Sequence, residues 1–212
     1  LALLVAAPIA AQVPSPVAFL GHEVGADYRL CNYTDMMRYF GAVAAASDRM
    51  KLVDIGATSY GQRMTMAVIS SPQNLARLER LREISVRMAH AEGVGAADVA
   101  ALCEEGRAVV WIDAGLHSTE AIAGQNLIEL VWQMTSRDDA EVRRILDEVV
   151  LLVCPVNPDG LELVYADAGV VPDPSATTTS CRYQVAGTKV FNGGEGIEHA
   201  NGWLHFTTKG DN

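Results

Sequence analysis

The feature that most constrains this chain is an apolar run that ends in a small-residue turn and a pair of polar side chains. Residues 109–112 read Val-Val-Trp-Ile, and an Asp-Ala-Gly turn follows them. His117 and Glu120 come next, three positions apart, ahead of an amphipathic segment that covers residues 121–134. A strand, a turn, a polar pair and a helix in this order place side chains at the carboxyl end of a strand, where α/β proteins bind their ligands.

The chemistry of His117 and Glu120 suits a metal ion, because imidazole and carboxylate are both good ligands for zinc. Catalytic zinc takes three protein ligands and a water, so a third ligand would have to come from elsewhere in the chain. The same residues also fit a purely structural role. In that interpretation Ser118 or Thr119 caps the following helix and Glu120 lies near its positive end. The spacing of the two residues leaves both interpretations open.

A second apolar run, residues 149–156, has almost no alternation, which is typical of a strand buried on both faces. Residues 157–160, Asn-Pro-Asp-Gly, are turn formers and end it. Two further strands are predicted at residues 51–56 and 64–70, and Gly61 can supply the positive φ of a hairpin turn between them. Strands that alternate with helices, together with one hairpin, predict an α/β fold with a mixed parallel and antiparallel sheet flanked by helices.

Apolar residues at helical spacing, with capping residues ahead of them, predict the helices. These cover residues 35–46, capped by Thr34; 72–91, led by Ser71 and Pro72; 97–105; 121–134; and a short segment after Asp138 or Asp139. Residues 13–29 are expected to form an extended lead-in, and a short strand is expected at residues 203–207. Beyond about residue 164 the regular alternation of elements stops.

The formal charge of −10 over 212 residues argues against nucleic acid as the main partner and offers no basic patch for an anionic membrane. Residues 1–11 are apolar and end in small residues, which is typical of the remnant of a signal peptide and predicts a secreted or periplasmic protein. This stretch is too short to span a bilayer, and a buried N-terminal strand or helix is the alternative.

The four cysteines form no Cys-x-x-Cys pair, so a zinc-knuckle site is not indicated. Cys154 lies inside an apolar run and is expected to be a small buried hydrophobic residue.

The motifs taken together resemble the zinc carboxypeptidases of the carboxypeptidase A-like metallopeptidase family. Residues 115–120 read Gly-Leu-His-Ser-Thr-Glu and match that family's Gly-x-His-x-x-Glu segment, and residues 157–160 match its Asn-Pro-Asp-Gly turn at the expected distance. Residues 55–63 resemble the family's early hairpin. Residues 19–27 resemble the lead-in of a secreted bacterial branch. The resemblance covers residues 14–164.

The resemblance implies a zinc-dependent metallocarboxypeptidase that hydrolyses peptide bonds at or near the C-terminus, with Zn²⁺ as cofactor and a peptide as substrate. By motif position, His117 and Glu120 would be zinc ligands. The family's third zinc ligand, its carboxylate-binding Arg and its general-base Glu all lie further downstream. None can be assigned here after Gly160, where His199 and His205 are the only histidines.

The chain is therefore expected to be an incomplete one that represents the N-terminal half of the family's domain. Residues 1–11 would be a leader, residues 12–164 part of the catalytic domain and residues 165–212 a divergent tail. Two alternatives stay open: a non-catalytic binding protein, and an amidase or deacylase on the same scaffold. A third ligand and an Arg-bearing pocket would separate them. The oligomeric state is not predicted.

Overall fold

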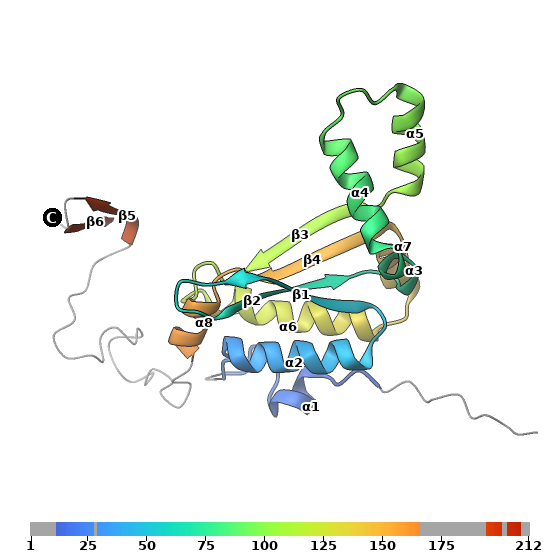
Figure 1. Ribbon diagram of the computed structural model, residues 1–212. Helices are drawn as coiled ribbons and strands as arrows, with labels where there is room; N and C mark the ends of the chain where they lie inside the picture. Colours follow the sequence, from blue (N-terminus) through green and yellow to red (C-terminus); the bar gives the residue numbers. More distant parts are fainter. Residues whose placement is uncertain (1–11, 28, 166–193, 201–202, 209–212) are drawn as a thin grey trace, which may run out of the picture. The chain divides into compact units, whose positions relative to one another are not determined.

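The computed structural model describes residues 12–27, 29–165, 194–200 and 203–208 (Figure 1). Contacts between residues divide the chain into two compact units, Leu1–Gly169 and Val170–Asn212. The first unit contains the helices α1 (Pro16–Leu20), α2 (Tyr33–Ala46), α3 (Pro72–Ala76), α4 (Leu78–Ala89), α5 (Ala96–Glu105), α6 (Ala121–Ser136), α7 (Ala140–Glu148) and α8 (Pro158–Tyr165). Its strands are β1 (Met50–Ala57), β2 (Arg63–Ile69), β3 (Ala108–Ala114) and β4 (Val149–Pro155).

These strands form one mixed sheet with the order β1-β2-β4-β3. β1 pairs antiparallel with β2, and β2 pairs antiparallel with β4. β3 runs parallel to β4, with Trp111 opposite Leu152 and Asp113 opposite Cys154. A parallel pair needs a crossover connection, and α6 and α7 supply it between β3 and β4. The predicted α/β fold with a mixed sheet flanked by helices is therefore confirmed.

The predicted hairpin is β1 and β2, and its turn has the backbone that the glycine suggested. Gly61 has φ 83°, a left-handed conformation that costs glycine nothing but strains other residues. The ladder runs from Met50 opposite Ile69 to Ala57 opposite Arg63. A register shift between Asp54 and Gly56 marks a bulge in β1, which bends the strand near the tip of the hairpin.

The main core lies between the sheet and the two long helices, α2 and α6, on one face of it (Figure 1). Met36, Phe40 and Val43 of α2 pack there with Ile128 and Val131 of α6, and all five are fully buried. The corresponding face of the sheet contributes fully buried residues of β2 and β4, among them Ala67, Ile69 and Val153. Removing this apolar surface from water is the main stabilisation that positions β3 and β4. Cys154 is also fully buried, as predicted.

Helix α2 starts earlier than predicted. It begins at Tyr33, and the side chain of Asn32, not of Thr34, caps it by accepting a hydrogen bond from the amide of Asp35 at 2.8 Å. Asn and Thr both cap well, so spacing alone did not distinguish them. The amide of Thr34 donates instead to the carboxylate of Glu162 at 2.9 Å, which ties the start of α2 to α8.

The single helix predicted over residues 72–91 is wrong, because it is two helices that meet at Arg77. This residue leaves the helical conformation at φ −117° and ψ 25°. Just before it, the side-chain amide of Asn74 donates to the carbonyls of Leu146 and Asp147, both at 3.0 Å, which fixes α3 against the end of α7. The chain then turns into α4. The extended lead-in over residues 13–29 is also interrupted, by α1, which Ser15 caps.

The carboxyl ends of β3 and β4 and the tip of the β1–β2 hairpin lie at the same end of the sheet, where α8 also lies (Figure 1). The Asn-Pro-Asp-Gly sequence was predicted to form a turn, but in the structure it begins helix α8. The carbonyl of Asn157 accepts from the amide of Leu161 at 3.0 Å, and Pro158 is the first helical residue. Proline suits that position because its amide would have no helical partner there.

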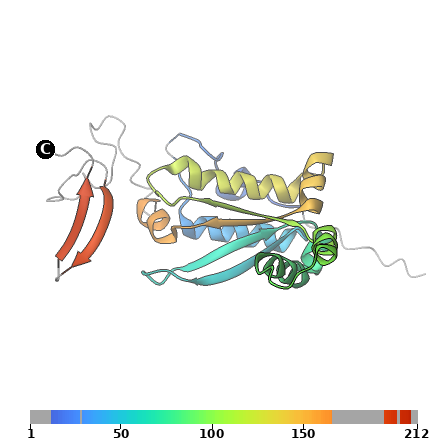
Figure 2. The same cartoon turned by 90° about the horizontal axis from the view of Figure 1, so that it is seen from above.

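In the second unit, β5 (Gly194–Ala200) and β6 (Trp203–Thr208) form an antiparallel pair (Figure 2). The strand predicted at residues 203–207 corresponds to β6. The predicted leader, residues 1–11, lies outside the described residues, as do residues 166–193 of the predicted tail. Among the described residues, no helix is both long enough and apolar enough to cross a bilayer.

Candidate metal centre

The structure brings His117 and Glu120 together as a pair. Nδ1 of His117 lies 3.2 Å from Oε1 of Glu120. Both side chains sit in the short loop between β3 and α6, and Glu120 directly precedes the first residue of that helix. They are 70% and 68% exposed, so they face solvent and not the core. An incoming ion or substrate can therefore reach both atoms without displacing packed side chains.

The separation of these two atoms fits a shared zinc ion. Zinc binds histidine nitrogen and carboxylate oxygen at about 2.0 to 2.2 Å in a tetrahedral arrangement, which places two ligand atoms about 3.3 to 3.5 Å apart. The observed 3.2 Å between Nδ1 and Oε1 is close to that value. The two groups contact each other at a separation that is compatible with two ligands to one ion.

The loop that carries the pair is shaped by a close contact with α8. Gly115 has φ 76°, and a Cβ atom on it would lie 3.0 Å from the side chain of Leu161. Gly124, one turn into α6, approaches the same side chain, which is fully buried. A larger residue at either glycine would push the loop or the start of α6 away from α8. The glycine ahead of His117 is therefore required by packing and by backbone conformation together.

Asn157, which follows β4, makes hydrogen bonds to this loop. Its side-chain Nδ2 donates to the backbone carbonyl of Leu116 at 2.9 Å and to Oγ of Ser118 at 3.1 Å. Its Oδ1 accepts from the amide of Gly160 at 2.9 Å, which caps the first turn of α8. The two residues that flank His117 in the chain are thus both hydrogen-bonded to a single side chain.

Helix α8 is itself anchored to two other elements. Oδ1 of Asp159 accepts from Oγ1 of Thr58 at 2.7 Å, and Oδ2 accepts from the amide of Tyr60 at 3.3 Å, which joins α8 to the tip of the hairpin. The carboxylate of Glu162 accepts from the amide of Thr34 at 2.9 Å, at the start of α2. Asp159, expected to shape a turn, instead connects two elements that are distant in sequence.

Arg63, the first residue of β2, contacts both the neighbouring strand β1 and helix α2. Its Nε donates to Oδ2 of Asp54 at 2.9 Å, and its guanidinium holds the pKa of that carboxyl below its ordinary value. The backbone carbonyl of Arg63 accepts a 2.6 Å hydrogen bond from the hydroxyl of Tyr33. The hairpin tip is therefore linked to α2 as well as to α8.

The predicted capping of α6 by Ser118 or Thr119 is wrong, whereas Glu120 does lie at the positive end of that helix, as this interpretation expected. α6 begins at Ala121, the residue at its N-cap is Glu120, and the side chain of Glu120 makes no capping hydrogen bond. Ser118 is buried and its hydroxyl lies toward Asn157 and the carbonyl of Gly115. The local contacts are those of a loop packed against α8, and they leave His117 and Glu120 pointing into solvent.

Two ligands do not complete a zinc site, and the described part of the chain gathers no group of three or more His, Cys, Asp or Glu side chains that could hold a metal ion. His199 and His205, the later histidines of the sequence, belong to β5 and β6 of the second unit, where His205 is opposite Glu198. The structure therefore places the two predicted ligands together and assigns no third.

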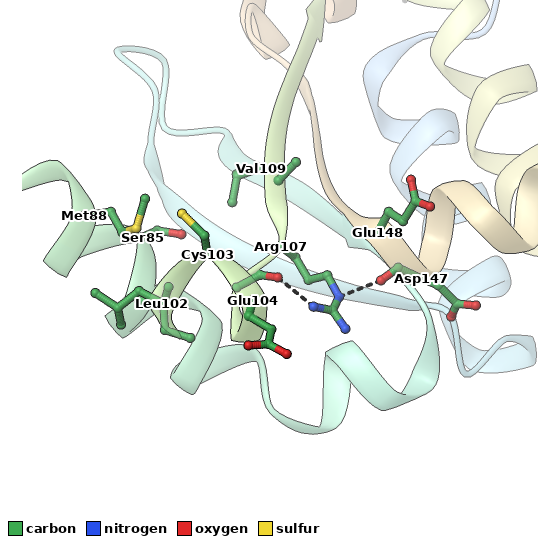
Figure 3. A pocket seen from close by; sticks show the side chains of 12 residues that line it. Ser85, Met88, Leu102, Cys103, Glu104, Arg107, Val109, Asp147 and Glu148 are labelled. Carbon is green, nitrogen blue, oxygen red and sulfur yellow. Dashed lines mark hydrogen bonds between the residues drawn. The ribbon is translucent and has the colours of Figure 1, made fainter. Parts of the chain in front are cut away.

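A cavity of about 640 Å³ lies at the opposite end of β3 (Figure 3). Arg107 is at its wall and donates to the carbonyls of Asp147 at 2.7 Å and Gly106 at 2.6 Å. Met88 and Leu102 line its apolar side. Arg107 directly precedes β3 and His117 follows the end of that strand, so this cavity is separate from the candidate metal pair.

The thiols of Cys31 and Cys154 contribute nothing to the pair. Both are buried, and burial raises the pKa of Cys31 to about 12 and of Cys154 to about 11, so both stay protonated at neutral pH. A zinc ligand must be the deprotonated thiolate, which these sites disfavour. Cys103 is exposed on α5, and Cys181 lies outside the described residues.

Asn157 and Gly160 were not predicted from the sequence as residues that build the site. Both belong to the Asn-Pro-Asp-Gly motif, but a turn after the strand was a sufficient explanation for that motif. A Cβ atom on Gly160 would overlap Oγ of Ser118 and lie 2.5 Å from Nδ2 of Asn157. The glycine is thus needed for close approach between α8 and the loop that carries the pair.

Comparison with known proteins supports what the motifs and the geometry indicate. Residues 36–189 match the zinc carboxypeptidase family. The match continues past residue 164, where the resemblance read from the motifs ends. No curated protein matches the chain. Since the family match covers most of the 212 residues, the chain belongs to the zinc carboxypeptidase family.

Proposed function

We propose that this chain is part of a zinc-dependent metallocarboxypeptidase, which hydrolyses peptide bonds at or near the C-terminus of its substrate, and that His117 and Glu120 are two of its zinc ligands. The observation that carries the proposal is the 3.2 Å separation between Nδ1 of His117 and Oε1 of Glu120 in a loop fixed from both sides. Membership of the zinc carboxypeptidase family supports the same chemistry.

Each part of the loop has a defined task in this proposal. His117 and Glu120 hold the ion, and their exposure leaves a path for the substrate. Leu116 and Ile122, which are 63% and 69% exposed, present apolar surface on either side of the pair in the chain. A bound zinc ion supplies Lewis-acid polarisation of a carbonyl and lowers the pKa of a bound water. A third ligand, a general base and a carboxylate-binding group complete the site in the active protein.

A secreted or periplasmic location belongs to the same proposal. Its support is the apolar stretch of residues 1–11, which ends in small residues ahead of Gln12. A peptide at the surface of the cell or in the periplasm would then be the substrate class. Measuring where the natural protein accumulates, in the culture medium and cell fractions, tests this part separately.

The reaction is tested with the zinc-loaded natural protein, including any residues that complete the site, and a pair of N-blocked peptides, one with a free C-terminal carboxylate and one with a C-terminal amide. Mass spectrometry of the products identifies the bond that is cut. Release of the last residue from the free peptide alone is the expected result. Equal cleavage of both peptides, or cleavage of the blocking acyl group, would instead indicate an amidase or deacylase. Zinc binding without any cleavage would indicate a non-catalytic binding protein.

A further inference from the structure

We infer that Asn157 is a positioning residue for the metal-ligand loop: it holds His117 and Glu120 in place through the loop backbone without contacting the ion. This inference rests on the proposed function, because the two ligands are those proposed above. Asn157 follows strand β4, whereas the loop follows the neighbouring strand β3. The pairing of β3 with β4 brings the two segments together across about forty positions of sequence.

The hydrogen bonds of Asn157 have a polarity that only an amide can provide. Nδ2 has two hydrogens and donates to two acceptors, the carbonyl of Leu116 at 2.9 Å and Oγ of Ser118 at 3.1 Å. Oδ1 is the acceptor for the amide of Gly160 at 2.9 Å. The same side chain therefore caps α8 with its oxygen and restrains the loop with its nitrogen.

The restraint acts on the residues that surround the ligands. Leu116 directly precedes His117, and Ser118 directly follows it, so the peptide carbonyl before the histidine and the side chain after it are both held against Asn157. The carbonyl of His117 in turn accepts from the amide of Glu120 at 2.9 Å, which couples the position of one ligand to that of the other. A shift of the loop at Leu116 or Ser118 would therefore change the separation of Nδ1 and Oε1.

Helix α8 is a rigid enough support for this role because it has three independent contacts. Leu161 is fully buried against Gly115 and Gly124, Asp159 is bonded to Thr58, and Glu162 is bonded to the start of α2. Gly160 allows the approach, since any side chain there would overlap Ser118. Partners outside the ligand set that orient metal ligands commonly change metal affinity by about 10- to 100-fold when they are removed.

Asn157→Asp separates the positioning role from the capping role. Aspartate is about as good a helix cap as asparagine, so the bond to the amide of Gly160 is kept. The two donated hydrogens are lost, and a carboxylate oxygen faces the carbonyl of Leu116. The matched control is Gln73→Glu, which makes the same exchange of an amide for a carboxylate at an exposed position of α3. Ser118→Ala removes one of the Asn157 contacts from the loop side.

Two measurements are made on each full-length variant: hydrogen–deuterium exchange of the amides of residues 116–120 in the metal-free protein, and zinc affinity by competition with a chelator. For Asn157→Asp we expect a cooperative thermal transition, exchange in this loop faster by about tenfold, as for one lost hydrogen bond, and zinc affinity weaker by about 10- to 100-fold. Ser118→Ala should change both in the same direction by less, and Gln73→Glu should change neither.

Unchanged exchange and unchanged zinc affinity in folded Asn157→Asp would overturn the inference, as would equal effects in Gln73→Glu. If Asn157→Asp does not fold, Ser118→Ala decides in the same way. A wild-type protein that binds no zinc would contradict the proposed function. Hydrogen–deuterium exchange measured without metal tests the positioning separately: faster exchange in Asn157→Asp than in Gln73→Glu supports it, and equal exchange overturns it.

Discussion

Oγ1 of Thr58 donates a 2.7 Å hydrogen bond to Oδ1 of Asp159, a residue 101 positions further along the chain. The same hydroxyl accepts from the amide of Gln62 at 2.9 Å, which closes the tip of the hairpin. One threonine thus organises the turn and joins it to the first turn of α8. Because α8 also supports the loop with His117 and Glu120, this bond links the hairpin to the candidate metal centre.

Removing that hydroxyl should lower the stability of the protein. Thr58→Val keeps the size and the β-branched shape, and loses a hydrogen bond to a charged acceptor. The expected loss in the free energy of unfolding is about 1.5 to 3 kcal/mol, measured by urea denaturation. Thr119→Val makes the same exchange at an exposed site and should cost less than about 0.5 kcal/mol. Equal effects in the two variants would show that the Thr58–Asp159 bond does not support the fold.

Gly160 is expected to tolerate no side chain. In Gly160→Ala the new Cβ would overlap Oγ of Ser118 and crowd Nδ2 of Asn157, so the loop or α8 must move. Overpacking of this kind costs about 1 to 3 kcal/mol, and the melting temperature should fall accordingly. Gly41→Ala is the control, because Gly41 lies inside α2 with nothing within 4 Å of its Cβ position. It should raise stability by about 0.5 to 1 kcal/mol, as alanine favours a helix interior.

Cys154 should make the protein less stable at alkaline pH. Burial raises its pKa from 9.0 to about 11, so between these values the unfolded chain loses a proton that the folded chain keeps. The unfolding free energy must therefore fall as pH rises through this window, and the contribution is complete below pH 9. In Cys154→Ala, urea denaturation from pH 8 to 11 should show a shallower decline than in the wild type. A decline as steep in Cys154→Ala as in the wild type would contradict this prediction.

The sequence was sufficient to predict those parts of the fold that depend on local patterns. The unbroken apolar run of β4 and the glycine at the hairpin turn each have one physical explanation, and the structure has both where they were expected. The break at Arg77 was not predictable in the same way. It depends on the side chain of Asn74 reaching carbonyls about seventy positions away, and no local pattern records such a contact.

For the candidate site, His117 and Glu120 were predicted as a pair from the resemblance of their motif, because their spacing alone left a structural role open, and the structure places Nδ1 and Oε1 3.2 Å apart. The partner that holds their loop could not be predicted from spacing. The side-chain amide of Asn157, after β4, donates to the loop after β3, and the sequence shows only that Asn157 belongs to a group of turn formers. The role of Gly160 follows from the same contact, and becomes apparent only when α8 and the loop are placed together.

The zinc content of the purified wild-type chain tests the account most directly, with the single variants His117→Ala and Glu120→Ala measured beside it. The samples are prepared with zinc, dialysed against metal-free buffer and analysed by atomic emission. The account predicts zinc in a one-to-one ratio with the wild-type chain and its loss in both variants, while the far-ultraviolet circular dichroism of all three stays the same. A wild-type chain free of zinc, or a variant that retains it in full, would contradict the account.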